Sequence, residues 1–288
     1  WIMVDLGITF NKGELPGTDV IMPDPLFIEE KNNDLLGLIL THGHEDHLGA
    51  VPYLWPKLKC PIYATPFTTS ILKEKLITAK LDSDVDIRVV KTNSKFDIYP
   101  FKIELIGLTH SIPESTAIVI RTPTKTVFHT GDWKFDQEPV CGSKTNKKAL
   151  KALSNENVIA MVCDSTNVFN PGSSGSEFEL LRPLTKVISK YHELIVISCF
   201  ASNIARLATI SQAANVNGRR VLLLGRSLKR MEKAARENGF LNNIPNFVSE
   251  KEAKNIPRNK VLIICTGSQG EPRAALSKLA TNQHPSFI

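Results

Sequence analysis

The feature that most constrains the fold is a run of six residues, 42–47, that holds four side chains able to bind a metal ion. The run reads His-Gly-His-Glu-Asp-His and begins one residue after an apolar segment, Leu35 to Leu40. Imidazole nitrogens and carboxylate oxygens are ligands that zinc and similar divalent ions accept. The run therefore predicts a metal-binding loop at the end of a strand, with a polar loop of surface histidines as the alternative.

The spacing of the run also indicates the kind of site. Structural zinc sites usually contain cysteine sulfur, often from C-x-x-C pairs, and the run has no cysteine. His42 and His44 alternate and can reach one ion together, whereas Asp46 and His47 continue toward a neighbouring position. We therefore expect an open, catalytic site with two adjacent ions, which suits the hydrolysis of esters and above all of phosphate esters.

Length and composition indicate a globular protein. At 288 residues the chain has room for one large domain or two ordinary ones, and 42% apolar residues suffice for a core. No apolar run is long enough to span a bilayer, and the N-terminus, which looks cut within a strand, lacks the pattern of a signal peptide. The odd number of scattered cysteines predicts small core residues of a reducing cytoplasm: Cys60, Cys141, Cys163, Cys199 and Cys265.

The net charge of +6 is divided unevenly along the chain. Residues 1–172 carry 18 Lys and Arg against 21 Asp and Glu, a net charge of −3, whereas residues 173–288 carry 17 against 8, a net charge of +9. A basic lobe is often only a solvated face, but beside a site for phosphate esters it favours a nucleic-acid partner.

The first part of the chain predicts short strands with candidate ligands at their ends. The expected strands are 2–5, 36–40, 62–64, 98–107, 117–121, 126–129 and 158–163, with a helix at 67–80. His110 follows one of these strands, and Asp132 follows another through a glycine, so both could complete the metal site and Asp132 could bridge two ions. The alternatives are that His110 is only a capped loop residue and that Asp132 only forms a turn. We expect His129 to lie in the core or behind a ligand, and His192 and His284 at the surface.

The chain changes its pattern after a break at residues 170–175. Strand, loop and helix then repeat three times, which predicts a parallel sheet with crossover helices: 194–198 and 204–214, 221–224 and 228–238, 261–265 and 271–279. The loop between each strand and the following helix consists mostly of small and polar residues. Helices that begin at the carboxyl ends of parallel strands can bind phosphate with their first N–H groups. Ordinary helix capping is the alternative. The candidate phosphate contacts are Ser202, Asn203, Arg226, Ser227, Gly267, Ser268 and Gln269.

These residues resemble a known family. The histidine run with His110, Asp132 and Asp5 resembles the metallo-β-lactamase fold. Further strings narrow the resemblance to ribonuclease J, of the β-CASP branch that processes nucleic acids: FHTGDWKFD at 128–136, DSTN at 164–167, FASNI at 200–204, GRS at 225–227 and CTGSQGEP at 265–272. The resemblance implies an α/β fold, in which a metallo-β-lactamase αβ/βα sandwich (residues 1–172) carries an inserted β-CASP domain (residues 173–288).

The resemblance also implies roles for individual residues. His42, His44 and His110 would hold one ion, Asp46 and His47 the second, and Asp132 would bridge them, with Asp46, Asp132 and Asp164 as the catalytic carboxylates. Asp164 would sit beside the second ion, and Asp5 would orient a ligand. The family cleaves RNA from a 5′-monophosphate end in the 5′→3′ direction and also internally. Its two ions are usually zinc, with manganese or magnesium also supporting activity, and its members form dimers or tetramers in the cytoplasm.

The chain departs from the family pattern at its C-terminus. The family returns from its β-CASP insert to the first domain and supplies a His-x-Ser-Gly-His run and a last histidine ligand, whereas this chain ends at Ile288 before either. We therefore expect an internal fragment with an incomplete insert and sandwich, and with the second ion one ligand short. The competing interpretations are another metallo-β-lactamase hydrolase, acting on a thioester or lactam, and a catalytically silent RNA-binding subunit.

Overall fold

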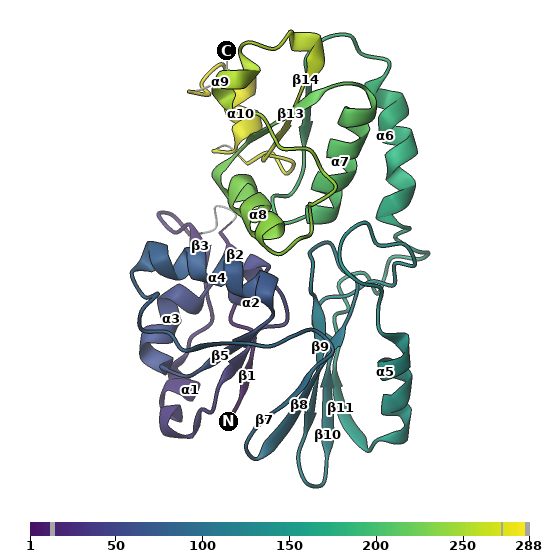
Figure 1. The fold of residues 1–288 in the computed structure, drawn as a ribbon. Coiled ribbons are helices and arrows are strands. Elements are labelled where there is room, and N and C mark those ends of the chain that lie inside the picture. The colour runs from purple at the N-terminus through teal and green to yellow at the C-terminus, as the bar shows by residue number, and fades with distance from the viewer. Residues whose placement is uncertain (12–14, 272, 286–288) are drawn as a thin grey trace. The chain divides into compact units, whose positions relative to one another are not determined.

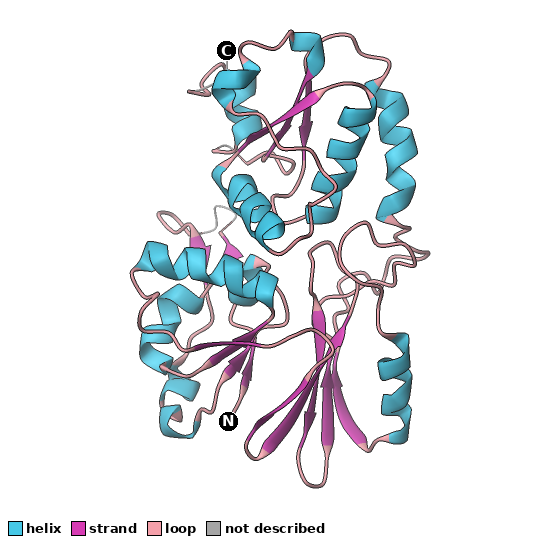
Figure 2. Cartoon of the chain, in the orientation of Figure 1, coloured by secondary structure: helices cyan, strands magenta, loops and turns pink. Residues whose placement is uncertain are grey.

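The computed structural model describes residues 1–11, 15–271 and 273–285, which form two compact units (Figures 1 and 2). The first unit contains residues 1–110, 114–135 and 143–172. The second contains residues 111–113 and 136–142 together with the chain from Ser173 onward. Among the described residues, no helix has the length and apolar character that a membrane span requires.

The first unit contains a parallel sheet in the order β1-β4-β5-β6, made of Met3–Val4, Leu38–Ile39, Ile62–Ala64 and Ile87–Val89. The side chains of β4 and β5 are buried on both faces, as expected for parallel strands covered on both sides. Helices α3 (Val51–Leu58) and α4 (Pro66–Ala79) lie beside this sheet (Figure 1). Pro66 is favoured at a helix start because its missing N–H would have no partner there.

A second, mostly antiparallel sheet has the order β11-β10-β9-β8-β7. Its strands are Lys95–Ile98 (β7), Phe101–Gly107 (β8), Thr116–Arg121 (β9), Thr126–His129 (β10) and Val158–Val162 (β11), and only β10 and β11 pair in parallel. The single strand expected at 98–107 is wrong, because β7 and β8 form a hairpin. Pro100 lies at its turn, where it need not donate a ladder hydrogen bond.

The core of the first unit lies between its two sheets. Ile39 and Tyr63 of the parallel sheet pack against Ile103, Leu105 and Ile118 of the other sheet. The opposite face of the second sheet is covered by α5 (Lys147–Ala152) and the 3-10 turn that follows it, Leu153–Asn155. Helices therefore flank two packed sheets, which confirms the expected αβ/βα sandwich.

Strand β11 is an edge strand with exposed apolar side chains. Ile159 is 52% exposed and Met161 is 61% exposed, although all five residues of the run 158–162 are apolar. Cys163, directly after this strand, is exposed as well, so its assignment to the core is wrong. Among the described residues, β11 pairs only with β10, and no described element covers its side chains. Cys60, Cys199 and Cys265 are buried as expected, and Cys141 is half-buried.

Several short elements complete the first unit. Strands β2 (Thr9–Phe10) and β3 (Val20–Ile21) form a separate antiparallel pair. One turn of helix, α2 (Glu45–Leu48), holds the end of the histidine run. The remaining short pieces are α1 (Leu26–Glu29) and the 3-10 turn Asn32–Asp34.

The second unit has a three-stranded parallel sheet in the order β12-β14-β13, made of Ile195–Ser198, Val261–Cys265 and Arg220–Leu224. Helices α9 (Glu250–Ala253) and α10 (Ala275–Ala280) pack on one face. Helices α7 (Ile204–Val216) and α8 (Arg226–Glu237) contact β13, and α6 (Leu181–Ile188) runs beside α7 (Figure 1). The expected alternation of strands and helices is confirmed. The last helix begins at Ala275 rather than at residue 271, because Ala274 first donates to the Glu271 carbonyl at 3.0 Å in a turn.

Candidate metal centre

The loop that begins with the histidine run is fixed at its first residue. Thr41 is fully buried, and its N–H and hydroxyl donate to the two carboxylate oxygens of Asp5 at 2.7 and 2.8 Å. Its carbonyl accepts from the N–H and the hydroxyl of Thr116 at 3.1 and 3.0 Å. The neighbouring strands β1 and β4 bring Asp5 beside Thr41, so both sheets of the unit hold the start of the loop.

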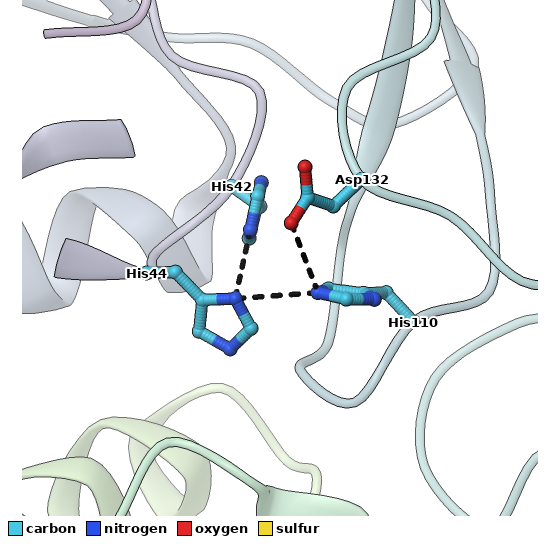
Figure 3. Close-up of side chains that lie close together, drawn as sticks. All are labelled: His42, His44, His110 and Asp132. Atoms are coloured by element: carbon cyan, nitrogen blue, oxygen red, sulfur yellow. Dashed lines mark hydrogen bonds and ion pairs between the residues drawn. The ribbon is translucent and has the colours of Figure 1, made fainter. Parts of the chain in front are cut away.

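Four side chains meet at the first group of candidate ligands (Figure 3): His42, His44, His110 and Asp132. His44 Nδ1 lies 2.9 Å from His42 Nε2 and 3.2 Å from His110 Nε2. The Oδ2 of Asp132 lies 3.7 Å from His110 Nε2. One ligand atom from each of the four lies within 4.8 Å of the others, a spacing that allows one ion to contact all of them.

Asp46 and His47 form a second group with Asp132, which belongs to both groups. His47 Nε2 lies 3.2 Å from Asp132 Oδ1 and 3.7 Å from Asp46 Oδ2. The other ring nitrogen, Nδ1, lies 2.7 Å from Asp5 Oδ2. A carboxylate on the far nitrogen is the usual way in which a protein orients a histidine ligand.

Asp132 reaches both groups because the backbone before it approaches two other chain segments closely. Gly131 has a φ of +56°, and a Cβ at this position would lie 2.8 Å from the Thr116 carbonyl oxygen. Only glycine accepts both conditions without strain. The Asp132 carbonyl accepts from the Ser115 hydroxyl at 2.9 Å, which fixes the residue on its other side.

The three histidines of the first group are held neutral. Burial lowers the pKa of His42 well below its usual value and that of His44 to about 3, and the neighbouring imidazoles lower both further. Burial also lowers the pKa of His110, although Asp132 opposes the shift. Neutral imidazoles keep a lone pair for an ion, so this group is ready to bind a cation at neutral pH.

His47 differs from the other three. Burial alone would lower its pKa, but hydrogen bonds to Asp132 and Asp5 outweigh burial and raise the pKa to about 10. The same contact with His47 lowers the pKa of Asp132. A proton on His47 therefore occupies the second group in the metal-free protein, and an ion that binds there must displace it.

The donor set fits divalent ions. The two groups together offer four imidazoles and two carboxylates without thiolate, and these ligands suit zinc and also manganese. All six residues expected as ligands lie in the two groups. Their occupation by two ions stays a prediction.

Asp164, expected beside the second ion, lies outside both groups. Its Oδ1 accepts from the N–H of Thr166 at 2.9 Å and from the Thr166 hydroxyl at 2.7 Å. Its own N–H donates to the Thr130 hydroxyl at 3.0 Å, which connects the end of β11 to the end of β10. The carboxylate raises the pKa of His110, so it contributes negative charge to the centre even though it is no member of either group.

The candidate phosphate contacts of the second unit follow its three parallel strands. Asn203 caps α7 by accepting from the Arg206 N–H at 2.9 Å, as the capping alternative expects. Gly225 precedes α8 with a φ of +126°, and Arg226 and Ser227 form the first turn of that helix. At the third junction Gly267 is buried, and the Gln269 N–H donates to Glu271 Oε2 at 3.0 Å. Ser202 is half-buried and Ser268 exposed, so the binding of phosphate by this set stays a prediction.

Sequence reasoning passed over the residues that hold the ligands in place. Thr41 binds the carboxylate of Asp5, and Ser115 and Thr116 bind backbone carbonyls of the site, but none of the three is a candidate ligand. Threonine and serine are common residues, and these three form no recognisable motif. The position of Thr41 directly before His42 was an available signal, whereas Ser115 is 17 residues from Asp132 in sequence and gave none. Gly7 is a further such residue, because a Cβ there would lie 1.7 Å from the Asp46 carbonyl oxygen.

The pKa shifts predict how the metal-free protein responds to pH. The raised pKa of His47 contributes stability that is complete below about pH 6.5 and is lost as the pH rises through about 10. The lowered pKa values of His42 and His44 act in the opposite sense, since their contribution is present above pH 6.5 and is lost as the pH falls below it, for His44 toward about 3. Urea unfolding in EDTA should therefore show a maximum of stability near pH 6.5.

The variant His47→Gln serves as the control for this pH dependence. In this variant the stability should no longer fall above pH 6.5 through deprotonation of His47. The fall in stability below pH 6.5 should remain. A decline of the same size in His47→Gln and in the unchanged protein would contradict the assignment.

Comparisons with known proteins agree with this fold and this centre. The model of the "beta-lactamase superfamily domain" matches residues 3–145, and the model of the "ribonuclease J, beta-CASP domain" matches residues 192–287. A protein of unknown function from Enterococcus faecalis V583 shares the fold, with a TM-score of 0.61, 15% identity, and coverage of 93% of this chain and 72% of that one. Fold and ligands together define a metallo-β-lactamase domain that carries a β-CASP domain.

Within that class, the chain belongs to the ribonuclease J family. It is 45% identical over 283 residues to Ribonuclease J of Sinorhizobium meliloti, a match that covers 98% of this chain and 50% of that protein. It is 36% identical to Ribonuclease J 1 of Streptococcus pyogenes (98% and 50% covered) and 32% identical to Ribonuclease J2 of Bacillus subtilis (98% and 51% covered). The chain thus spans about half the length of these relatives.

Proposed function

We propose that the intact protein is a metal-dependent ribonuclease that hydrolyses RNA phosphodiester bonds, as a 5′→3′ exonuclease on 5′-monophosphate RNA and as an endonuclease. The observation that carries this proposal is the sharing of Asp132 by two adjacent ligand groups. Adjacent ions held by one carboxylate suit an in-line displacement at phosphorus. The names of the relatives supply the substrate class, and the +9 charge of residues 173–288 supports it.

The residues of the centre would have different roles in the proposed reaction. Two divalent ions would supply a bound water molecule whose pKa is lowered toward about 7, and they would compensate the charge of the phosphate. Asp5 holds the His47 ring through Nδ1, so that Nε2 faces the centre. The side chain of Asp46 is 67% exposed and could orient the attacking water or accept its proton.

We also propose zinc as the resident metal, with manganese or magnesium as substitutes, and the loops after β12, β13 and β14 as contacts for the RNA backbone. Asp164 would act through its negative charge near His110. A dimer or tetramer of the intact protein is part of the same proposal. Each of these statements rests on the family resemblance and on the charge and position of the residues named.

Product analysis on RNA with defined 5′ ends tests the proposed activity. The intact protein should release mononucleotides from 5′-monophosphate RNA and spare the 5′ end of 5′-triphosphate RNA. Dialysis against a chelator should abolish both exonucleolytic and internal cleavage, and added zinc or manganese should restore them. Absence of cleavage of either RNA by the metal-loaded protein would contradict the proposal.

A further inference from the structure

The second unit contains a small polar cavity of about 130 Å³ that no step of the proposed function uses. Its lining comes from the segments that precede the three parallel strands: Tyr191 and His192 before β12, Asn217 and Arg219 before β13, and Asn259 and Lys260 before β14. The strands run in parallel, so these segments meet at the amino edge of the sheet. The candidate contacts after β12, β13 and β14 lie at the opposite, carboxyl edge.

Arg219 is a buried cation, and no acidic side chain of the described residues pairs with it. Its side chain is 5% exposed, and its guanidinium donates to three carbonyls, those of Glu193 at 2.8 Å, Val261 at 3.1 Å and Tyr191 at 2.6 Å. The Nε–H makes no hydrogen bond with any described residue. Burial is the one influence that shifts the Arg219 pKa, and it lowers it. A buried charge is costly unless an opposite charge compensates it, and an anion in this cavity would supply that charge.

The rim of the cavity adds a second cation. Lys260 is exposed, and in the described part of the chain its ammonium group has no hydrogen bond or ion pair. Its Nζ lies 3.8 Å from the place that a Cβ on Gly218 would take, so the side chain lies over the turn that leads into Arg219. None of the described residues that line the cavity is acidic. By contrast, Lys229 and Arg206 of the same unit are paired with Glu250 and Glu177.

We propose that this cavity binds a phosphate group, either as inorganic phosphate or as a phosphodiester of a nucleic-acid strand. Its volume of about 130 Å³ is enough for one tetrahedral oxyanion. Arg219 has two N–H donors that these carbonyls do not use, one on Nε and one on Nη2, and guanidinium donors of this kind bind phosphate oxygens. Lys260 supplies a mobile point charge, and the amide of Asn259 a neutral donor. The site does not depend on the metal centre.

A residue-resolved titration tests the site. The 15N-labelled 288-residue chain, kept in EDTA, is titrated with sodium phosphate at constant ionic strength and followed by amide chemical shifts. Saturable shifts are expected at Gly218, Asn259 and Lys260. Lys260→Glu should weaken this binding at least tenfold. Lys278→Glu makes the same charge change on α10, beyond the carboxyl end of β14, and should leave the binding unchanged.

A second titration identifies the source of the phosphate. A short oligouridylate with a 5′-hydroxyl end offers phosphodiesters alone. Shifts of the same amides by both ligands would assign the site to a nucleic-acid backbone, and shifts by inorganic phosphate alone would assign it to the free anion. Either result supports the site. Absence of saturable shifts at these amides with both ligands, or equal weakening by Lys260→Glu and Lys278→Glu, would overturn it.

Discussion

Replacement of Asp132 by alanine should abolish RNA cleavage by the intact protein and leave RNA binding largely in place. Asp132 is the one residue that belongs to both ligand groups, so its loss reduces one group from four ligands to three and the other from three to two. Removal of residues that merely support a ligand costs about 10–100-fold in metal affinity or activity, and the loss of a shared ligand should exceed that range. The measurements are bound metal per chain, product formation and RNA binding.

The matched control for this experiment is Asp97→Ala. Asp97 is an exposed carboxylate on β7, so its removal makes the same change in charge away from the centre. It should keep both the metal content and the activity. Hydrolysis at an undiminished rate by the Asp132→Ala protein, with its metal content intact, would refute the bridging role and with it the assignment of the two groups.

The grouping of the candidate metal ligands could be predicted because most of these residues are local in sequence. His42 to His47 lie within one loop, and His110 and Asp132 each follow an apolar strand whose end must lie at a sheet edge. The contacts that hold these ligands are not local. Asp5 is 42 residues from His47 and 36 from Thr41, and it reaches both because β1 pairs beside β4. Such pairing depends on the assembled sheet and leaves no periodic signal.

The sheet of the second unit was predictable for a physical reason. Parallel strands covered by helices on both faces need continuous apolar runs, and β14 is buried at all five of its positions. The helix starts were less predictable. α8 begins at Arg226 rather than at the expected residue 228, because a polar first turn adds nothing to the apolar pattern.

Two differences between the predicted and the observed elements lie at prolines. Pro100 should have divided the expected strand 98–107, since proline inside a strand cannot donate to the ladder. Helix α3 is not among the predicted elements, and it contains two prolines, Pro52 and Pro56, residues that are typical of helix breaks. Pro52 lies in the first turn, where no intrahelical donor is needed, and α3 includes Pro56 at the cost of one backbone hydrogen bond.

Gly7→Ala should destabilise the first unit strongly, and by more than Gly17→Ala. A Cβ on Gly7 would lie 1.7 Å from the carbonyl oxygen and 2.0 Å from the carbonyl carbon of Asp46. These atoms are backbone, and hydrogen bonds clamp this stretch on both sides, from the Leu6 N–H to the His47 carbonyl and from the Ala50 N–H to the Leu6 carbonyl. The loop cannot retreat without breaking them, so a loss of more than about 4 kcal/mol in unfolding free energy is expected.

Gly17→Ala separates this clash from the general cost of losing a glycine. Gly17 has a φ of +78° but nothing within 4 Å of its Cβ position, so alanine there should cost only the left-handed backbone strain of about 1–2 kcal/mol. Urea unfolding of both variants, with metal content measured in parallel, makes the comparison. Equal losses of unfolding free energy in the two variants would mean that Gly7 does not pack closely against the backbone of Asp46. A larger loss for Gly7→Ala, together with lost metal, would mean that this contact shapes the second ligand group, because Asp46 and His47 lie at the point of the clash.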